Sequence, residues 1–109
     1  MFRGSAEMTK LWFEREDIID KVRAEGRRIY EKRGLQELPD FPDDSFKEDA
    51  LDVLASIRLE TKDCWPIILL EECWESISED DPKKKKAELI QVMAVAMQWI
   101  DSIERRNKF

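Results

Sequence analysis

Apolar residues recur at spacings of about three, four and seven positions through the first third of the chain. They are Leu11, Trp12, Ile18, Ile19, Val22, Ile29 and Tyr30. This spacing predicts an amphipathic helix from Thr9 to about Arg33, and Gly34 is a residue type that commonly ends helices. The next stretch, LQELPDFPDD, contains Pro39 and Pro42. Because proline restrains the preceding residue away from helix, this stretch is predicted to be a connecting loop.

A second helix is predicted after this loop. Ser45 and Glu48 have the spacing of a capping box, in which each side chain accepts a hydrogen bond from a free amide at the helix start. The helix is therefore predicted to begin at Ser45 and to end near Glu60. Its apolar stripe consists of Phe46, Ala50, Val53, Leu54 and Ile57.

Two more helices are predicted in the second half of the chain. After a short connection, Asp63 is predicted to cap a third helix that ends at about Ser78. An acidic turn follows. Asp81 with Pro82 directly behind it predicts the start of a fourth helix, which extends to about Arg106, because proline is well tolerated in the first turn.

Composition agrees with a helical chain. The 109 residues are 42% hydrophobic and 40% charged, with only three glycines. We expect an N-terminal tail over residues 1–8 and a single all-α domain over residues 9–109. Of the four tryptophans, each lies in an apolar helical pattern and is expected in the core. They are Trp12, Trp65, Trp74 and Trp99.

Charge and residue usage exclude several functional classes. The net charge of −6 disfavours nucleic-acid binding, which usually needs a basic surface. No stretch approaches a membrane span, and the first residues lack the apolar centre of a signal peptide, so a cytoplasmic protein is expected. The chain has no histidine, which excludes the usual zinc sites. Cys64 and Cys73 are expected to be reduced core thiols.

Carboxylates carry the remaining chemistry. Within E-E-C-W-E of the third helix, Glu72 and Glu75 are about 60° apart around the helix axis and share a face. Within A-E-L-I-Q of the fourth helix, Glu88 and Gln91 repeat the spacing. Two carboxylates on one helix thus correspond to a carboxylate and an amide on the next.

The short connection Asp80–Pro82 predicts that the third and fourth helices form an antiparallel hairpin. At about 1.5 Å per residue, Glu75 and Glu88 would both lie roughly 10 Å from the turn and face each other. Trp65 would then lie near Trp99. Three carboxylates gathered at one level repel one another, so a cation is expected, and oxygen ligands select Mg²⁺ or Mn²⁺. The alternative is that they are solvated or salt-bridged surface carboxylates.

At these residues the chain resembles the MazG-like all-α nucleoside triphosphate pyrophosphohydrolases, whose signature is ExxE, a gap, then ExxD. Glu72 and Glu75 match the first half, SISEDDPKKKKA forms a gap of 12 residues, and Glu88 begins the second half. Gln91 stands where the family has Asp, and Trp74 replaces a usual glycine. RRIYEKRGLQELPD also looks like the end of the family's first helix. The resemblance covers roughly residues 20 to 106.

The resemblance implies a four-helix, MazG-like bundle completed by oligomerisation, and a Mg²⁺-dependent enzyme that converts a nucleoside triphosphate into monophosphate and pyrophosphate. Glu72, Glu75 and Glu88 would be catalytic metal ligands, and one of them, left open, would assist as general base. Gln91 would belong to the metal site, directly or by a hydrogen bond to a ligand; the alternative is an ordinary helix residue. Lys84, on the face of Glu88, would contact the triphosphate; the alternative is a solvated lysine run.

The last two helices look apolar on more than one side, which predicts a homodimer or homotetramer. One side has Ile67, Leu70, Cys73 and Ile77, and the other has Ile90, Met93 and Met97. Two alternatives stay open. One is a catalytically impaired helical protein of the same fold that binds a nucleotide or a protein partner; Gln91 and Trp74 favour it. The other is a purely structural helical oligomer.

Overall fold

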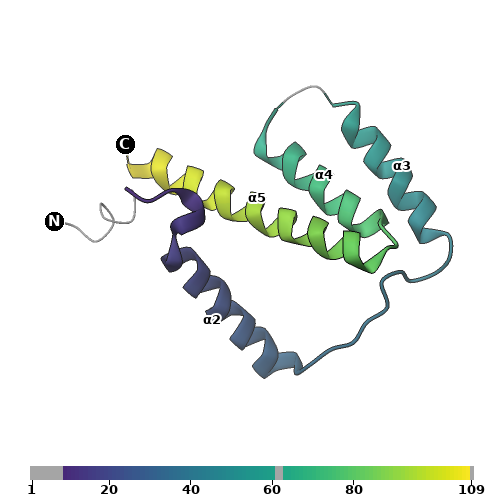
Figure 1. The fold of residues 1–109 in the computed structure, drawn as a ribbon, viewed down its shortest axis with the longest axis horizontal. Helices are drawn as coiled ribbons and strands as arrows, with labels where there is room; N and C mark the ends of the chain where they lie inside the picture. The colour runs from purple at the N-terminus through teal and green to yellow at the C-terminus, as the bar shows by residue number, and fades with distance from the viewer. Residues whose placement is uncertain (1–8, 61–62, 109) are drawn as a thin grey trace. The chain divides into compact units, whose positions relative to one another are not determined.

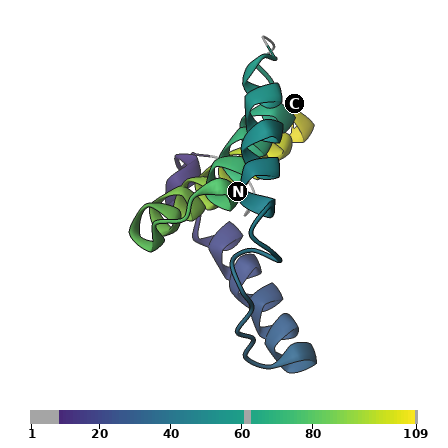
Figure 2. The same ribbon diagram turned by 90° about the vertical axis from the view of Figure 1, so that its right-hand side faces the viewer.

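Helices make up all the regular secondary structure in the residues that the computed structural model describes, 9–60 and 63–108 (Figure 1). The predicted all-α class is therefore confirmed, whereas the predicted tail over residues 1–8 lies outside the described residues. The elements in order are η1 Trp12–Glu14, α2 Glu16–Arg33, α3 Phe46–Arg58, α4 Trp65–Ser78 and α5 Pro82–Lys108. Figures 1 and 2 both draw an irregular connection between α2 and α3, as the prolines predicted.

Contacts divide the chain into two units, which are described separately. The central unit is Pro39–Trp99, and the terminal unit joins the described residues up to Leu38 to those from Ile100 onward. Helix α5 begins in the central unit and ends in the terminal one. No described helix has the length and apolar character that crossing a membrane requires.

In the terminal unit, the continuous helix predicted from Thr9 to Arg33 is wrong at its start. A 3₁₀ turn ends at Glu14, and Arg15 has φ −80° and ψ 89°, which is not helical. The reason is tertiary. The buried Arg15 guanidinium donates hydrogen bonds to Asp17, and to Asp101 and Glu104 of α5. The spacing of apolar residues along the chain gives no information about that interaction.

In the central unit, α3 and α4 pack against each other. Lys47 near the start of α3 pairs with Asp80 just beyond α4, and Arg58 at the end of α3 pairs with Glu75. The two helices are therefore antiparallel. Ala50 and Leu54 of the predicted apolar stripe are buried.

Helices α4 and α5 are joined only by residues 79–81, as expected of a hairpin. The ring of Trp65, the first residue of α4, stacks on Trp99 of α5 with centroids 6.4 Å apart and planes at 13°. This confirms the predicted pairing of the two tryptophans. Asp81 also caps α5 as predicted, because its Oδ2 accepts a hydrogen bond from the Lys84 amide at 3.3 Å.

Two other predicted caps are wrong. Ser45 lies in the helical region of φ and ψ and makes no capping hydrogen bond; its Oγ instead donates to Asp43 Oδ1 at 2.8 Å. Ser45 does not cap because an N-cap residue normally has an extended backbone, from which its side-chain oxygen reaches the amides of the first turn. The residue before α4 is Cys64, not Asp63, and Cys64 has extended backbone without a side-chain cap.

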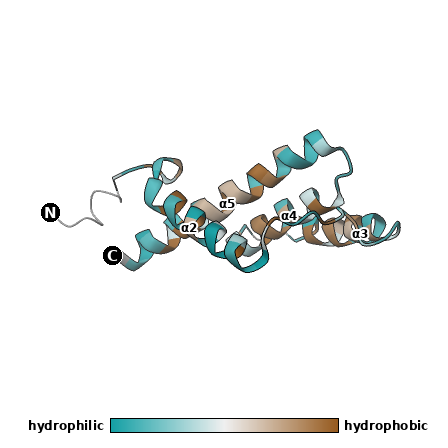
Figure 3. Ribbon diagram, turned by 90° about the horizontal axis from the view of Figure 1, so that it is seen from below, coloured by the Kyte–Doolittle hydropathy of each residue, from teal (hydrophilic) through white to brown (hydrophobic). Residues whose placement is uncertain are grey.

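Burial also differs from expectation at the cysteines and tryptophans. Cys64 and Cys73 are free thiols as predicted, but Cys64 is exposed and therefore is not a core residue. All four tryptophans are half-buried, so none belongs to a fully enclosed core. Figure 3 shows apolar residues concentrated on α3, α4 and the middle of α5, whereas α2 is largely hydrophilic.

Candidate carboxylate site

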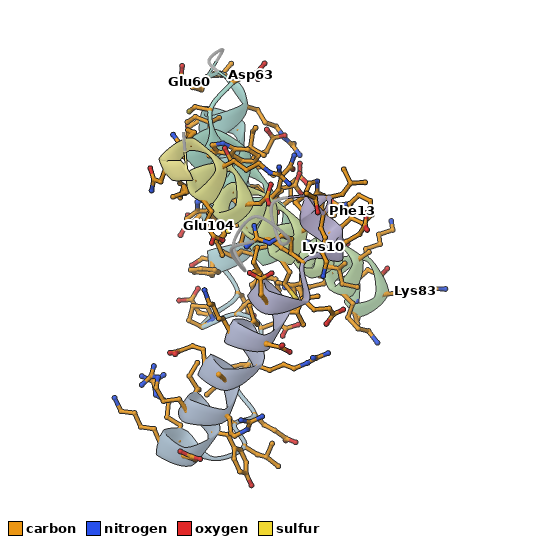
Figure 4. All side chains as sticks on the ribbon, turned by 90° about the vertical axis from the view of Figure 1, so that its left-hand side faces the viewer. Lys10, Phe13, Glu60, Asp63, Lys83 and Glu104 are labelled. Atoms are coloured by element: carbon orange, nitrogen blue, oxygen red, sulfur yellow. The ribbon has the colours of Figure 1, made fainter. Side chains whose placement is uncertain are left out.

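The candidate site consists of residues of α4 and α5 in the central unit. Glu72 and Glu75 are in the second half of α4, and Glu88 is in the second turn of α5. Figure 4 labels Glu60 and Asp63 where α3 leads into α4, and it labels Lys83 where α5 begins. All three glutamates lie in the parts of α4 and α5 nearest the turn at residues 79–81, and they act on one another electrostatically.

Glu72 has one carboxylate oxygen in an enclosed position. Its Oε2 is buried and has no hydrogen-bond partner in the structure. Burial raises the pKa of Glu72 above its usual range, and the negative charges of Glu75, Glu71 and Glu88 raise it further. An ionised Glu72 is therefore destabilising unless a positive charge joins it.

Glu88 repeats this situation from the other helix. Its Oε2 is also buried without a partner. Burial raises the pKa of Glu88, and so do the charges of Glu79 and Glu75, whereas Lys85 and Lys84 lower it. Two buried, unpartnered carboxylate oxygens thus come from two helices that share one acidic environment.

Glu75 differs because it has a cation. Arg58 Nη2, at the end of α3, donates a hydrogen bond to Glu75 Oε1 at 2.8 Å, and Arg58 Nε lies 3.8 Å from Glu71 Oε1. This hydrogen bond is the main reason that the pKa of Arg58 is raised. The residue pattern allowed these carboxylates to be metal ligands or to be solvated or salt-bridged surface groups. In this structure Glu75 is salt-bridged.

Sequence reasoning missed Arg58. The available signal was the contrast between helices: WPIILLEECWESIS carries three glutamates and no basic residue, and α3 ends in an arginine. Two helices joined by a short connection pack together, so that arginine was a candidate partner for the acidic helix. The distance along the chain concealed the pairing.

The two remaining predicted site residues are exposed. Gln91 is one turn beyond Glu88 on α5, and Lys84 is one turn before it. The structure brings Lys84 within electrostatic range of Glu88. Among residues 9–60 and 63–108, no three acidic or thiol side chains converge closely enough to hold a metal ion in their present rotamers.

Lys85 is a second basic residue that the sequence did not single out. Its side chain is 12% exposed, its Nζ lies 4.5 Å from the centre of the Phe41 ring, and Asp40 is 4.0 Å away. Beside it, residues 40–44, Lys47 and Asp80 line a cavity of about 520 Å³. The loop before α3 therefore lies at the same end of the hairpin as the glutamates.

Comparisons with protein-family models, curated proteins and solved structures find no match to this chain. The residues of the carboxylate site are thus the basis for inferring its chemistry.

Proposed function

We propose that this protein is a Mg²⁺-dependent nucleoside triphosphate pyrophosphohydrolase of the MazG-like type, which releases a nucleoside monophosphate and pyrophosphate. Mn²⁺ is the alternative metal. The observation that supports this most is the pair of buried, unpartnered oxygens, Glu72 Oε2 and Glu88 Oε2. Buried polar atoms are normally hydrogen-bonded, and an exception needs an explanation such as a water or an ion; the proposal is that an ion occupies this place.

The donor set fits a hard divalent cation. Glu72 and Glu88 offer oxygen ligands from two helices, and burial and neighbouring carboxylates raise the pKa of both, an effect that a bound cation would oppose. Glu75 would join them after rotating away from Arg58. Mg²⁺ commonly uses a few carboxylates and leaves its other positions to water and phosphate oxygens. The proposal requires side-chain rotations that gather the three glutamates, which already act on one another electrostatically, around the ion.

A divalent ion bound there would neutralise phosphate charge and lower the pKa of a coordinated water. The protein's own groups have simpler roles. Glu72 and Glu88 anchor the ion, Lys84 and Lys85 place positive charge beside Glu88, and one glutamate accepts the proton of the attacking water. The reaction breaks the linkage between the α and β phosphates. The cavity beside Lys85 is the proposed place for the nucleoside.

The direct test is to incubate the protein with common nucleoside triphosphates and Mg²⁺ and to measure pyrophosphate. We expect release that requires the metal and that Glu72→Gln and Glu88→Gln reduce about a hundredfold, since each removes a charged ligand. Glu48→Gln is the matched control, because Glu48 is an exposed glutamate of α3. Equal activity in all three variants would exclude this site.

Gln91 gives a second test, because an amide offers a neutral carbonyl oxygen where Asp would offer a charged one. We propose that the site is one anion short and binds metal weakly until the triphosphate supplies more oxygens. Gln91→Asp should then tighten Mg²⁺ binding, measured calorimetrically, and preserve or raise pyrophosphate release.

The exposed, uncharged Gln91 also favours the second candidate function, a nucleotide-binding protein without catalysis. If the parent and Gln91→Asp both bind a nucleoside triphosphate and release no pyrophosphate, this second function replaces the enzyme.

A further inference from the structure

The acidic residues of α4 already interact with one cation, the guanidinium of Arg58. It donates to Glu75 at 2.8 Å and lies 3.8 Å from Glu71. The charge of Glu88, on α5, also acts on it. Arg58 therefore interacts with carboxylates on both helices of the candidate site, although it belongs to neither.

A divalent cation bound at this site would compete with Arg58. Glu75 Oε1 cannot accept the full hydrogen bond of a guanidinium and also serve as an unobstructed metal ligand. Two adjacent cations also repel each other, strongly so where solvent is partly excluded. The hydrogen bond of Arg58 is to Oε1 of Glu75 and not to Oε2, so displacement of Arg58 depends on the repulsion between the two cations and on the loss of Oε1 as a ligand.

Arg58 is able to leave. Its side chain is 53% exposed, and it is the last residue of α3, so it can change rotamer without disturbing the buried Ala50 and Leu54. A guanidinium released beside a metal site is well suited to a phosphate chain, because its planar fork binds two phosphate oxygens at once. Arg58 would then compensate the negative charge that the substrate brings.

We infer that Arg58 is the resident counter-cation of the carboxylate site: metal displaces it from Glu75, and it then binds the phosphates of the incoming triphosphate. This inference rests on the proposed function, because it assumes that the carboxylates bind a divalent ion. It assigns Arg58 two successive partners, a carboxylate before metal binds and a phosphate in the loaded protein.

Calorimetric titration of the full chain with Mn²⁺ alone tests the first half. Arg58→Met should bind Mn²⁺ several-fold more tightly than the parent, because the competitor is gone. Arg58→Lys keeps the charge without the fork and should lie between them. Lys84→Met is the near control: it removes an equal charge close to Glu88 and no hydrogen bond to Glu75, so its effect on Mn²⁺ should be smaller.

A non-hydrolysable nucleoside triphosphate analogue, titrated at saturating Mn²⁺, tests the second half. Here Arg58→Met should bind the analogue about tenfold more weakly, as expected for a lost charged hydrogen bond. Tighter binding of the metal and weaker binding of the triphosphate analogue are changes of affinity in opposite directions. A residue that only supported the fold would weaken both.

Arginine Nε resonances provide a check that does not depend on Arg58→Met folding. On adding Mg²⁺ to the parent, the Arg58 signal, assigned by its loss in Arg58→Lys, should shift, and that of the exposed Arg28 should not. Unchanged Mn²⁺ affinity in Arg58→Met, or unchanged analogue affinity, overturns the inference and leaves the proposed function standing. If neither the parent nor Arg58→Met binds Mn²⁺, the metal site and the inference both fail.

Discussion

Arg15 is 1% exposed and makes hydrogen bonds to three carboxylates: Asp17 at 2.7 Å, Asp101 at 2.9 Å and Glu104 at 3.1 Å. Asp101 is buried too and also accepts from Arg105 at 2.6 Å. The hydrogen bonds to Asp17 and Asp101 and the charge of Glu104 raise the pKa of Arg15, so it stays charged. At this residue, the interactions of one side chain outweigh the helical preference of its neighbours.

Arg15→Met should destabilise the protein by about 3 kcal/mol, because removing one partner of a buried ion pair leaves the others uncompensated. Urea unfolding followed by circular dichroism measures the change. Arg28→Met removes an exposed arginine from a pair with Glu25 on α2 and should leave the unfolding midpoint unchanged. Similar midpoints for the two variants would mean that burial does not strengthen the Arg15 interactions.

Glu72 should affect stability in the opposite direction. Its pKa is raised above the ordinary 4.5, so its ionised form opposes folding when no metal is bound. Glu72→Gln should therefore raise the melting temperature at neutral pH. The gain should disappear as the pH falls through the raised pKa to below 4.5, where the carboxyl is protonated in both folded and unfolded chains.

Melting curves with and without millimolar Mg²⁺ complete this experiment. Metal should raise the melting temperature of the parent by mass action and should not raise that of Glu72→Gln. A variant that melts below the parent without metal, at neutral pH, would contradict the assigned repulsion.

At the scale of elements, helix starts show when a local signal is sufficient. Asp81 and Pro82 predicted the start of α5 correctly, because the cap and the amide it accepts from are three residues apart. Ser45 had an equally good local pattern, yet Asp43 takes its hydroxyl and its amide. Asp43 replaces Glu48 as the acceptor for the Ser45 amide, and the helical backbone of Ser45 removes the other half of the capping box.

Asp81→Ala should cost about 1 kcal/mol of stability, the usual value of a lost N-cap. Asp81→Asn keeps an acceptor oxygen and should recover most of this loss. Thermal unfolding of both variants measures it, and equal melting temperatures for parent and Asp81→Ala would show that α5 does not depend on this cap.

The hairpin of α4 and α5 is tested by its tryptophans. A double-mutant cycle on Trp65→Leu and Trp99→Leu should give a coupling of about 1 kcal/mol, as stacked aromatic pairs do. Additive single effects would mean that the two rings do not stack in solution.

At the scale of the whole molecule, the exposed apolar side chains are the feature that favours assembly of several chains. Ile90 and Met93 of α5 are 65% and 64% exposed. Val22, Ile29 and Tyr30 of α2 are exposed as well. Apolar helix faces of this kind are normally covered in an assembly, which is the state that the sequence predicted and that stays a prediction.

Light scattering should therefore give a mass of at least twice 13.0 kDa at micromolar concentrations. Met93→Glu should shift the mass toward the monomer, because it places a charge on the exposed apolar face of α5. Leu35→Glu is the matched control, since Leu35 is 91% exposed on the connection after α2. A parent mass near 13.0 kDa would contradict assembly.

The sequence by itself determined the all-α class, the approximate bounds of the last three helices, the end of α2 and the short turn that places Glu75 and Glu88 within electrostatic range. Each of these depends on residues close together in the chain: periodic apolar positions, a proline beside a cap, and a connection too short for any other path.

Only the tertiary structure decided which distant residues meet. Arg58 pairs with Glu75 across 17 positions and Arg15 with Asp101 across 86. These contacts depend on which helix faces pack together, and no local periodicity encodes that choice. Burial follows the same packing, which is why the unpartnered oxygens of Glu72 and Glu88 became evident only in the folded chain.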